Sequence, residues 1–201
     1  MNFVKKWMNC IISFIAGVCG LALSACPGML IRVSSSNPAI SEGLKAVGME
    51  SYSVKAFKIL TDADLYTEAK SLELGSEFMC MKVFAIITLV ISILLIIYAL
   101  VMLLKNLNVI KVESKIFDIA GIALIALLLV ATIGLFIASN NYANGVEDIA
   151  NKSLSAFLGE SASLASYKVK VGVYQPTMLV IAIISLVVTS VFTFIGKKKA
   201  A

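Results

Sequence analysis

The residues from Val83 to Leu104 form an uncharged run that contains neither proline nor glycine. As an α-helix these 22 residues would extend about 33 Å, and the hydrocarbon core of a bilayer is about 30 Å thick. Lipid offers no partner for backbone polar groups, so a lone spanning segment must be helical. The run therefore predicts a transmembrane helix and makes the chain a membrane protein.

Three further apolar runs have a similar length. The whole sequence is 60% hydrophobic and only 14% charged, whereas soluble domains carry about 25% charged residues. The fold class we predict is an all-α membrane protein, a bundle of four transmembrane helices. These helices are expected at 8–31, 83–104, 116–138 and 177–195, and Asp118 is the only ionisable residue inside them.

The basic residues indicate how the helices are oriented. The short segments 1–7, 105–115 and 196–201 hold eight basic residues and one acidic residue, whereas 32–82 and 139–176 together hold nine basic and ten acidic residues. Lysine and arginine concentrate in the cytoplasmic flanks of membrane helices. Both termini are therefore predicted to be cytoplasmic, in a plasma or cytoplasmic membrane, with 32–82 and 139–176 as extracytoplasmic loops.

Small residues recur along the predicted helices. Small side chains let membrane helices approach closely, and their hydroxyls can bond across the interface. The residues that we predict to pack helices together are Ala16, Gly20, Ser24 and Gly28 in the first run, Gly134 and Ala138 in the third, and Ala182, Ser185 and Thr189 in the fourth.

The two longer loops carry strand and helix patterns. In the first loop, the stretch that contains Tyr52 and Val54 is rich in strand-forming residues. In the second loop, apolar or aromatic residues alternate with lysine and glycine: Tyr167, Val169, Val171 and Val173 against Lys168, Lys170 and Gly172. A helix is predicted from Thr61 to about Glu77, a turn at Asn144-Gly145, and a helix from Val146 to Leu158. We predict that the two strands pair with each other in a two-stranded sheet. Sheet and helices would form a small extracytoplasmic α+β cap.

Four short motifs allow more than one interpretation. Leu23-Ser24-Ala25-Cys26 resembles a bacterial lipoprotein signal, which would leave a lipidated Cys26 at the new N-terminus, but the apolar run continues to Ile31 and favours an uncleaved helix. Cys26 and Cys80 would both lie near outer helix ends and could form a disulfide. Asn151 begins a glycosylation sequon, and Lys198-Lys199 resembles a dilysine retrieval signal, so both depend on the source.

The sequence contains no histidine, phosphate-binding loop or metal-ligand spacing. We therefore expect no enzyme activity and no catalytic, cofactor-binding or metal-binding residues. The basic residues flank apolar runs, so nucleic acid is not an expected partner. The expected partners are membrane lipid and either another protein or a second copy of the chain.

The order of segments resembles the claudin-like tetraspan layout: four membrane helices, a first outer loop of about fifty residues, a short basic cytoplasmic turn, a shorter second outer loop and a basic tail. The resemblance covers the architecture, because the family's Trp-Gly-Leu-Trp-type stretch with two following cysteines is absent. It implies a small outer sheet above a helix bundle, and a role in adhesion, barrier formation or chaperoning of channel partners.

Three functions follow as hypotheses. The first is a non-enzymatic scaffold, adhesion or accessory subunit that acts through its outer cap. The second is a small channel or transporter for an uncharged solute, lined by the hydroxyls of Thr88, Ser92, Ser185, Thr189 and Thr193. The third is a lipid-anchored bacterial envelope protein that is processed at Cys26.

Overall fold

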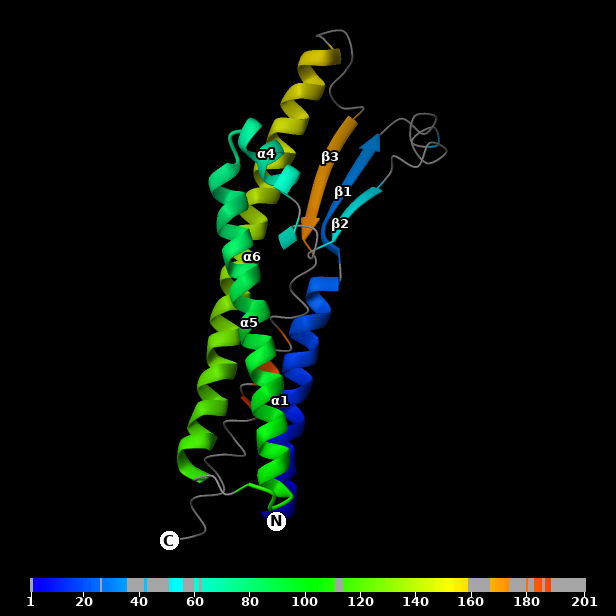
Figure 1. The fold of residues 1–201 in the computed structure, drawn as a ribbon. Coiled ribbons are helices and arrows are strands. Elements are labelled where there is room, and N and C mark those ends of the chain that lie inside the picture. Colours follow the sequence, from blue (N-terminus) through cyan, green and yellow to red (C-terminus); the bar gives the residue numbers. More distant parts are fainter. Residues whose placement is uncertain are drawn as a thin grey trace. The chain divides into compact units, whose positions relative to one another are not determined.

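A computed structural model describes most of the chain and is mainly helical (Figure 1). The described residues are 2–25, 27–35, 51–55, 63–110, 114–158 and 167–173, with short pieces at 42, 60–61, 180, 183–185 and 187–188. The helices are α1 (Asn2–Ala25), α4 (Ala63–Ser71), α5 (Gly75–Asn106) and α6 (Ser114–Leu158), and the strands are β1 (Pro27–Ser35), β2 (Ser51–Lys55) and β3 (Tyr167–Val173).

The chain divides into two compact units. The first unit contains residues 1–24, 84–134 and 175–201, and the second contains residues 25–83 and 135–174. Two helices in the described residues are long and apolar enough to cross a membrane: α5, and α6 from Ile119 to Ser153. Residues Trp7–Leu21 of α1 form a shorter apolar helix.

In the first unit, α1, α5 and α6 lie side by side (Figure 1). Their contact is a layer of apolar side chains with little or no exposed surface: Ala16 from α1, Ile91 and Leu95 from α5, and Ile125, Leu128 and Ala131 from α6. These side chains are in close contact, and many small van der Waals attractions between them add up. This layer holds the three helices together.

The first predicted membrane helix is too long. Residues 8–31 were expected to be one helix, but α1 ends at Ala25 and β1 begins at Pro27, so Gly28 lies in a strand and not on a helical packing face. Proline disfavours helical geometry in the residue before it and cannot donate a helical hydrogen bond. In the sequence, Pro27 indicates where the helix ends. Hydropathy alone does not locate this end, because an apolar run is compatible with a buried strand as well as with a helix.

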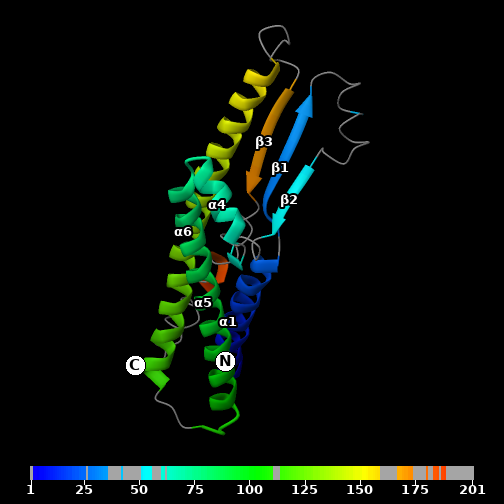
Figure 2. The same ribbon diagram turned by 45° about the horizontal axis from the view of Figure 1, so that its top comes forward.

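The second unit contains a sheet of three strands in the order β2-β1-β3 (Figure 2). The predicted pairing of the two loop strands with each other is wrong, since each pairs antiparallel with β1 instead. Ile31 of β1 faces Tyr52 of β2 and Val171 of β3 across the two ladders. The central strand came from the segment that was predicted to end the first helix.

Helix α6 is far longer than the predicted membrane segment 116–138. Its 45 residues extend about 68 Å and include Asn144-Gly145, which was predicted to be a turn. Tyr142 and Ala143 are buried, and Gly145 lies against the Leu74 side chain, so packing stabilises the helix through this polar stretch. Tertiary contacts therefore override the local turn preference of Asn-Gly.

The predicted helix 61–77 is divided by a turn. Leu74 N donates to Ala69 O (2.9 Å) and Glu73 N to Lys70 O (3.1 Å), and Glu73 has a φ of 60°. This pair of bonds is the Schellman pattern that ends a helix, and its left-handed position is usually glycine. The same pattern ends α5, where Asn108 takes the left-handed position.

Replacing Glu73 with glycine is expected to stabilise the protein by about 1 kcal/mol. The left-handed conformation costs an L-residue about 1–2 kcal/mol, and glycine avoids this cost. Part of the gain is lost, because glycine loses more backbone entropy on folding than glutamate does. For a chain of this length the melting temperature should rise by about 2–4 °C. The control is Ser71→Gly, at an exposed right-handed position of the same helix, which should lower the melting temperature. Equal effects of the two variants would contradict the prediction.

Candidate membrane-embedded surface and helix interface

The exposed face of α5 is entirely apolar over the predicted membrane segment. Between residues 83 and 104 every exposed residue is valine, isoleucine or leucine: Val83, Ile86, Ile87, Val90, Ile93, Leu94, Ile97, Leu100 and Leu104. A helix on the surface of a soluble protein shows charged and polar residues on its solvent side. This face is therefore suited to lipid and not to water.

Helix α6 shows the same face and then loses it. Its exposed residues from 119 to 138 are all apolar: Ile119, Ala123, Leu127, Val130, Ile133 and Ile137. Further along, the exposed residues are all polar or charged: Asn141, Asn144, Asp148, Lys152 and Ser153. The change falls at the end of the predicted segment 116–138, and the apolar stretch of about 28 Å matches the hydrocarbon thickness.

Polar side chains lie in the interior of the first unit. Asn9 and Ser13 on α1, Thr88 and Ser92 on α5, and Thr132 on α6 are buried, whereas Ile11, Phe14, Ile15 and Val18 on α1 are exposed. Apolar residues outside and small polar residues inside reverse the usual pattern of a soluble protein. That reversal is what helix association in lipid favours.

The interior hydroxyls of α5 and α6 are bonded within their own helices. Thr88 donates to Phe84 O (2.8 Å), Ser92 to Thr88 O (2.7 Å) and Thr132 to Leu128 O (2.9 Å). Such bonds satisfy a buried hydroxyl without a partner helix or a solute. Ser13 Oγ is fully buried and has no hydrogen-bond partner in the structure.

Glycines set the closest approaches between the helices of the first unit. A Cβ at Gly17 would lie 2.7 Å from Ile96 Cγ1 and 2.9 Å from Ser92 O of α5. A Cβ at Gly134 would overlap the Phe84 ring, and one at Gly121 would overlap the Tyr98 hydroxyl. Of these three, the sequence reasoning named only Gly134.

The other predicted packing residues divide into two groups. Ala16, Gly20 and Ala138 are buried, and so is Ser185 in the short described piece 183–185. The side chain of Ser24 and the residues Ala182 and Thr189 lie outside what the structure describes, as does most of the predicted helix 177–195. Asn9, Ser13 and Gly17 were missed, although their helical spacing with Ala16 and Gly20 could have revealed one continuous buried face.

One buried contact joins α1 to α5 through a thiol. Cys10 Sγ donates to Ala99 O at 3.1 Å, and Cys10, Tyr98, Ala99 and Met102 form a second apolar cluster. The thiol is a weak donor, so this contact mainly adds direction to the packing of α1 on α5. Cys10 is thus a buried structural residue.

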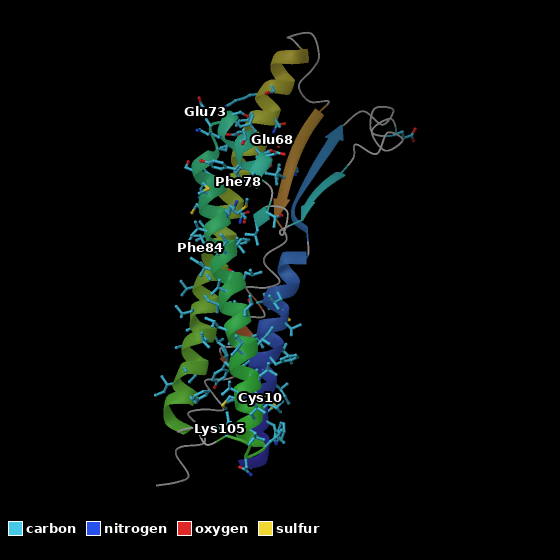
Figure 3. All side chains as sticks on the ribbon, viewed as in Figure 1. Cys10, Glu68, Glu73, Phe78, Phe84 and Lys105 are labelled. Carbon is cyan, nitrogen blue, oxygen red and sulfur yellow. The ribbon has the colours of Figure 1, made fainter. Side chains whose placement is uncertain are left out.

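Aromatic side chains hold the described helices of the second unit together. The Phe78 ring of α5, labelled in Figure 3, meets Tyr142 of α6 edge to face (centroids 5.5 Å apart) and Tyr66 of α4 at 6.2 Å. Such pairs are worth about 0.5–1.5 kcal/mol beyond their buried area. Burial, and then the negative charge of Glu68, raise the pKa of Tyr142, which lies past residue 138.

A carboxylate of α6 binds the outer edge of β3. Val171 N donates to Glu147 Oε2 at 3.2 Å, in a partly buried position. Val171 is also paired with Ile31 of β1, and β3 is an edge strand of the sheet. Glu147 therefore accepts a hydrogen bond from a backbone N–H that an edge strand would otherwise leave without a partner.

Glu147→Ala is expected to destabilise the edge of β3 by about 1 kcal/mol, because the amide of Val171 would lose a charged acceptor. Its hydrogen exchange should become about fivefold faster. Glu147→Gln keeps an acceptor oxygen and should restore part of the protection, and Asp148→Ala, at the exposed neighbouring residue, should have no effect. Unchanged exchange in Glu147→Ala would contradict the role of this bond.

The cysteine predictions rest mainly on residues beyond the described ones. Cys26 lies outside them, so its lipidation stays a prediction. Cys80 is exposed on α5 and carries a free thiol, so the predicted disulfide to Cys26 is not formed at Cys80 in this structure. Within the part of the chain that the structure describes, no cluster of three or more cysteine, aspartate or glutamate side chains is placed to hold a metal ion.

The residues that sequence reasoning placed in the outer sheet take strand positions. Tyr52 and Val54 lie in β2, and Tyr167, Val169, Val171 and Val173 lie in β3.

Comparison of the chain with models of protein families, with curated proteins and with solved structures found no match.

Proposed function

We propose that this chain is a four-pass integral membrane protein, with the segments 8–25, 83–104, 116–138 and 177–195 inside the bilayer. The observation that carries the proposal is the reversed distribution of polarity in the first unit. Every exposed residue that the structure describes in α5 from 83 to 104 and in α6 from 119 to 138 is apolar, while Ser13, Ser92 and Thr132 are buried. The apolar stretches have the length that a hydrocarbon core requires.

The orientation in this proposal follows from the charges. The termini and the connection 105–115 face the cytoplasm, and the charge-balanced segments 32–82 and 139–176 lie on the other side of the membrane, where they form an α+β cap. The resemblance to the claudin-like layout supports the same arrangement.

The role that we propose for the cap is binding, as a scaffold, adhesion or accessory subunit without enzymatic activity. The proposal is supported by two contacts of its described parts: β1 pairs with both β2 and β3, and Glu147 of α6 accepts a hydrogen bond from β3. The hydroxyls of Thr88 and Ser92 bond to their own helix, which favours a packed interior over a solute path. Transport of an uncharged solute is therefore the second candidate, and processing at Cys26 the third.

Membrane insertion and orientation are tested together. The chain should remain in the membrane pellet after extraction with alkaline carbonate. In intact cells an impermeant maleimide should label a variant whose only cysteine is Cys80. A second variant lacks the native cysteines and carries the substitution Val109→Cys in the exposed turn after α5. It should react with the maleimide only after the membrane is permeabilised. The opposite labelling pattern would invert the proposed topology, and extraction into the carbonate supernatant would exclude an integral protein.

The binding role has its own test. Purification in mild detergent should recover a second protein, or a second copy of this chain, in a fixed ratio. A monodisperse monomer without a partner would contradict the scaffold proposal. The intact mass of the same sample distinguishes a full-length chain from one that was cleaved and acylated at Cys26.

A further inference from the structure

An aromatic pair positions one lysine at the end of α5. Lys105 Nζ lies 5.8 Å from the centroid of the Phe117 ring, a cation–π distance. The Phe117 ring stacks on Tyr98 (centroids 5.9 Å apart, planes at 17°), and the Tyr98 hydroxyl donates to Phe117 O at 3.0 Å. Lys105 is half-buried, so its ammonium group is held in place and partly shielded from water.

The sequence adds further lysines next to the start of α1 and the end of α5. Helix α1 runs antiparallel to α5, since Cys10 contacts Ala99 and Gly17 contacts Ile96 and Ser92. The first turns of α1 therefore lie level with the end of α5, and Figure 3 labels Cys10 and Lys105 at this end. The segments 1–7 and 105–115 carry five lysines (Lys5, Lys6, Lys105, Lys111 and Lys115) against one acidic residue, Glu113.

We propose that this end of the first unit binds the phosphate groups of anionic phospholipids in the adjoining leaflet, with Lys105 as the positioned contact. The proposal rests on the proposed function, because it requires the bundle to lie in a bilayer. A lysine near an anionic membrane surface contributes about 1 kcal/mol of attraction. Lys105 loses less freedom than a mobile lysine when it meets a phosphate, because Phe117 already holds it. A zwitterionic headgroup carries its own cation, which competes for the same phosphate.

The test uses the full-length chain in nanodiscs made from equal amounts of phosphatidylglycerol and phosphatidylcholine, with retained lipids counted by native mass spectrometry. The wild-type chain should retain phosphatidylglycerol preferentially. Lys105→Gln should reduce this preference about fivefold, and Lys105→Arg should keep it. The matched control is Lys82→Gln, a half-buried lysine near the other end of α5, which should leave the preference unchanged.

Three results would overturn the inference. A chain that inserts and shows no preference, or whose preference survives Lys105→Gln, has no such contact. Loss of the retained lipid on addition of inorganic phosphate at constant ionic strength would show a site for free phosphate and not for lipid. A chain that fails to enter the nanodisc at all would overturn the membrane proposal itself, which is a separate observation from insertion without preference.

Discussion

Ile93→Lys is expected to impair insertion of α5 by about 2.5–3.5 kcal/mol, the largest effect of any exposed substitution proposed for this chain. Ile93 is 43% exposed and lies at the centre of the apolar segment 83–104. If its exposed face contacts hydrocarbon, a charge at this depth must be neutralised or reach for the interface. The fraction of chain that resists carbonate extraction should fall steeply.

Two companion variants make the result decisive. Leu107→Lys adds the same charge at an exposed position just past the end of α5 and should insert normally. Ile93→Leu keeps the apolar face and should behave as the wild type. In a water-soluble protein an exposed Ile→Lys substitution is usually within about 0.5 kcal/mol of neutral. A stable and soluble Ile93→Lys chain would therefore end the membrane proposal.

Gly17→Val is expected to destabilise the first unit by about 3 kcal/mol. The obstacle is backbone: the added Cβ would meet Ser92 O at 2.9 Å and Ile96 N at 3.2 Å, and neither atom can move without shifting α5. By the scaling for a chain of this size, the melting temperature in detergent should fall by about 6–12 °C. Gly17→Ala should produce a smaller fall in the same direction.

The matched control is Val18→Ile, one residue further along α1 on the exposed face. It adds a methyl group toward the surroundings and should leave the melting temperature within about 1 °C of the wild type, since it meets no neighbouring helix. Equal melting temperatures for Gly17→Val and the wild type would show that α1 does not approach α5 as closely as the contacts indicate.

The helical segments 83–104 and 116–138 were predictable because one property of each residue decides them. That property is the free energy of transfer of the side chain from water to an apolar medium. The segments 83–104 and 116–138 lie inside α5 and α6 as expected. Their ends were not predictable from hydropathy, since α5 begins earlier, at Gly75, and α6 continues to Leu158. Outside the apolar stretch a helix continues only if its side chains pack, as Phe78 and Tyr142 do.

The candidate surface was predictable in part for the same reason. The apolar character of α5 can be read from the sequence, but the face that is exposed depends on where α1 and α6 pack. The spacing of Ala16 and Gly20 indicated the buried face of α1, whereas the contact of Gly17 with Ser92 required two helices at a defined distance. The aromatic support of Lys105 joins residues of α5 and α6 whose pairing no local pattern encodes.

By itself, the sequence determined that 83–104 and 116–138 are apolar and helical, because this depends on composition over a window of residues. The tertiary structure alone decided that β1 separates β2 from β3, that α6 continues through Asn144-Gly145, and that Glu147 accepts a hydrogen bond from the edge of β3. Each of these outcomes is a choice of partner between residues far apart in the chain. Such choices depend on which backbone groups are left to be satisfied once the other elements have packed.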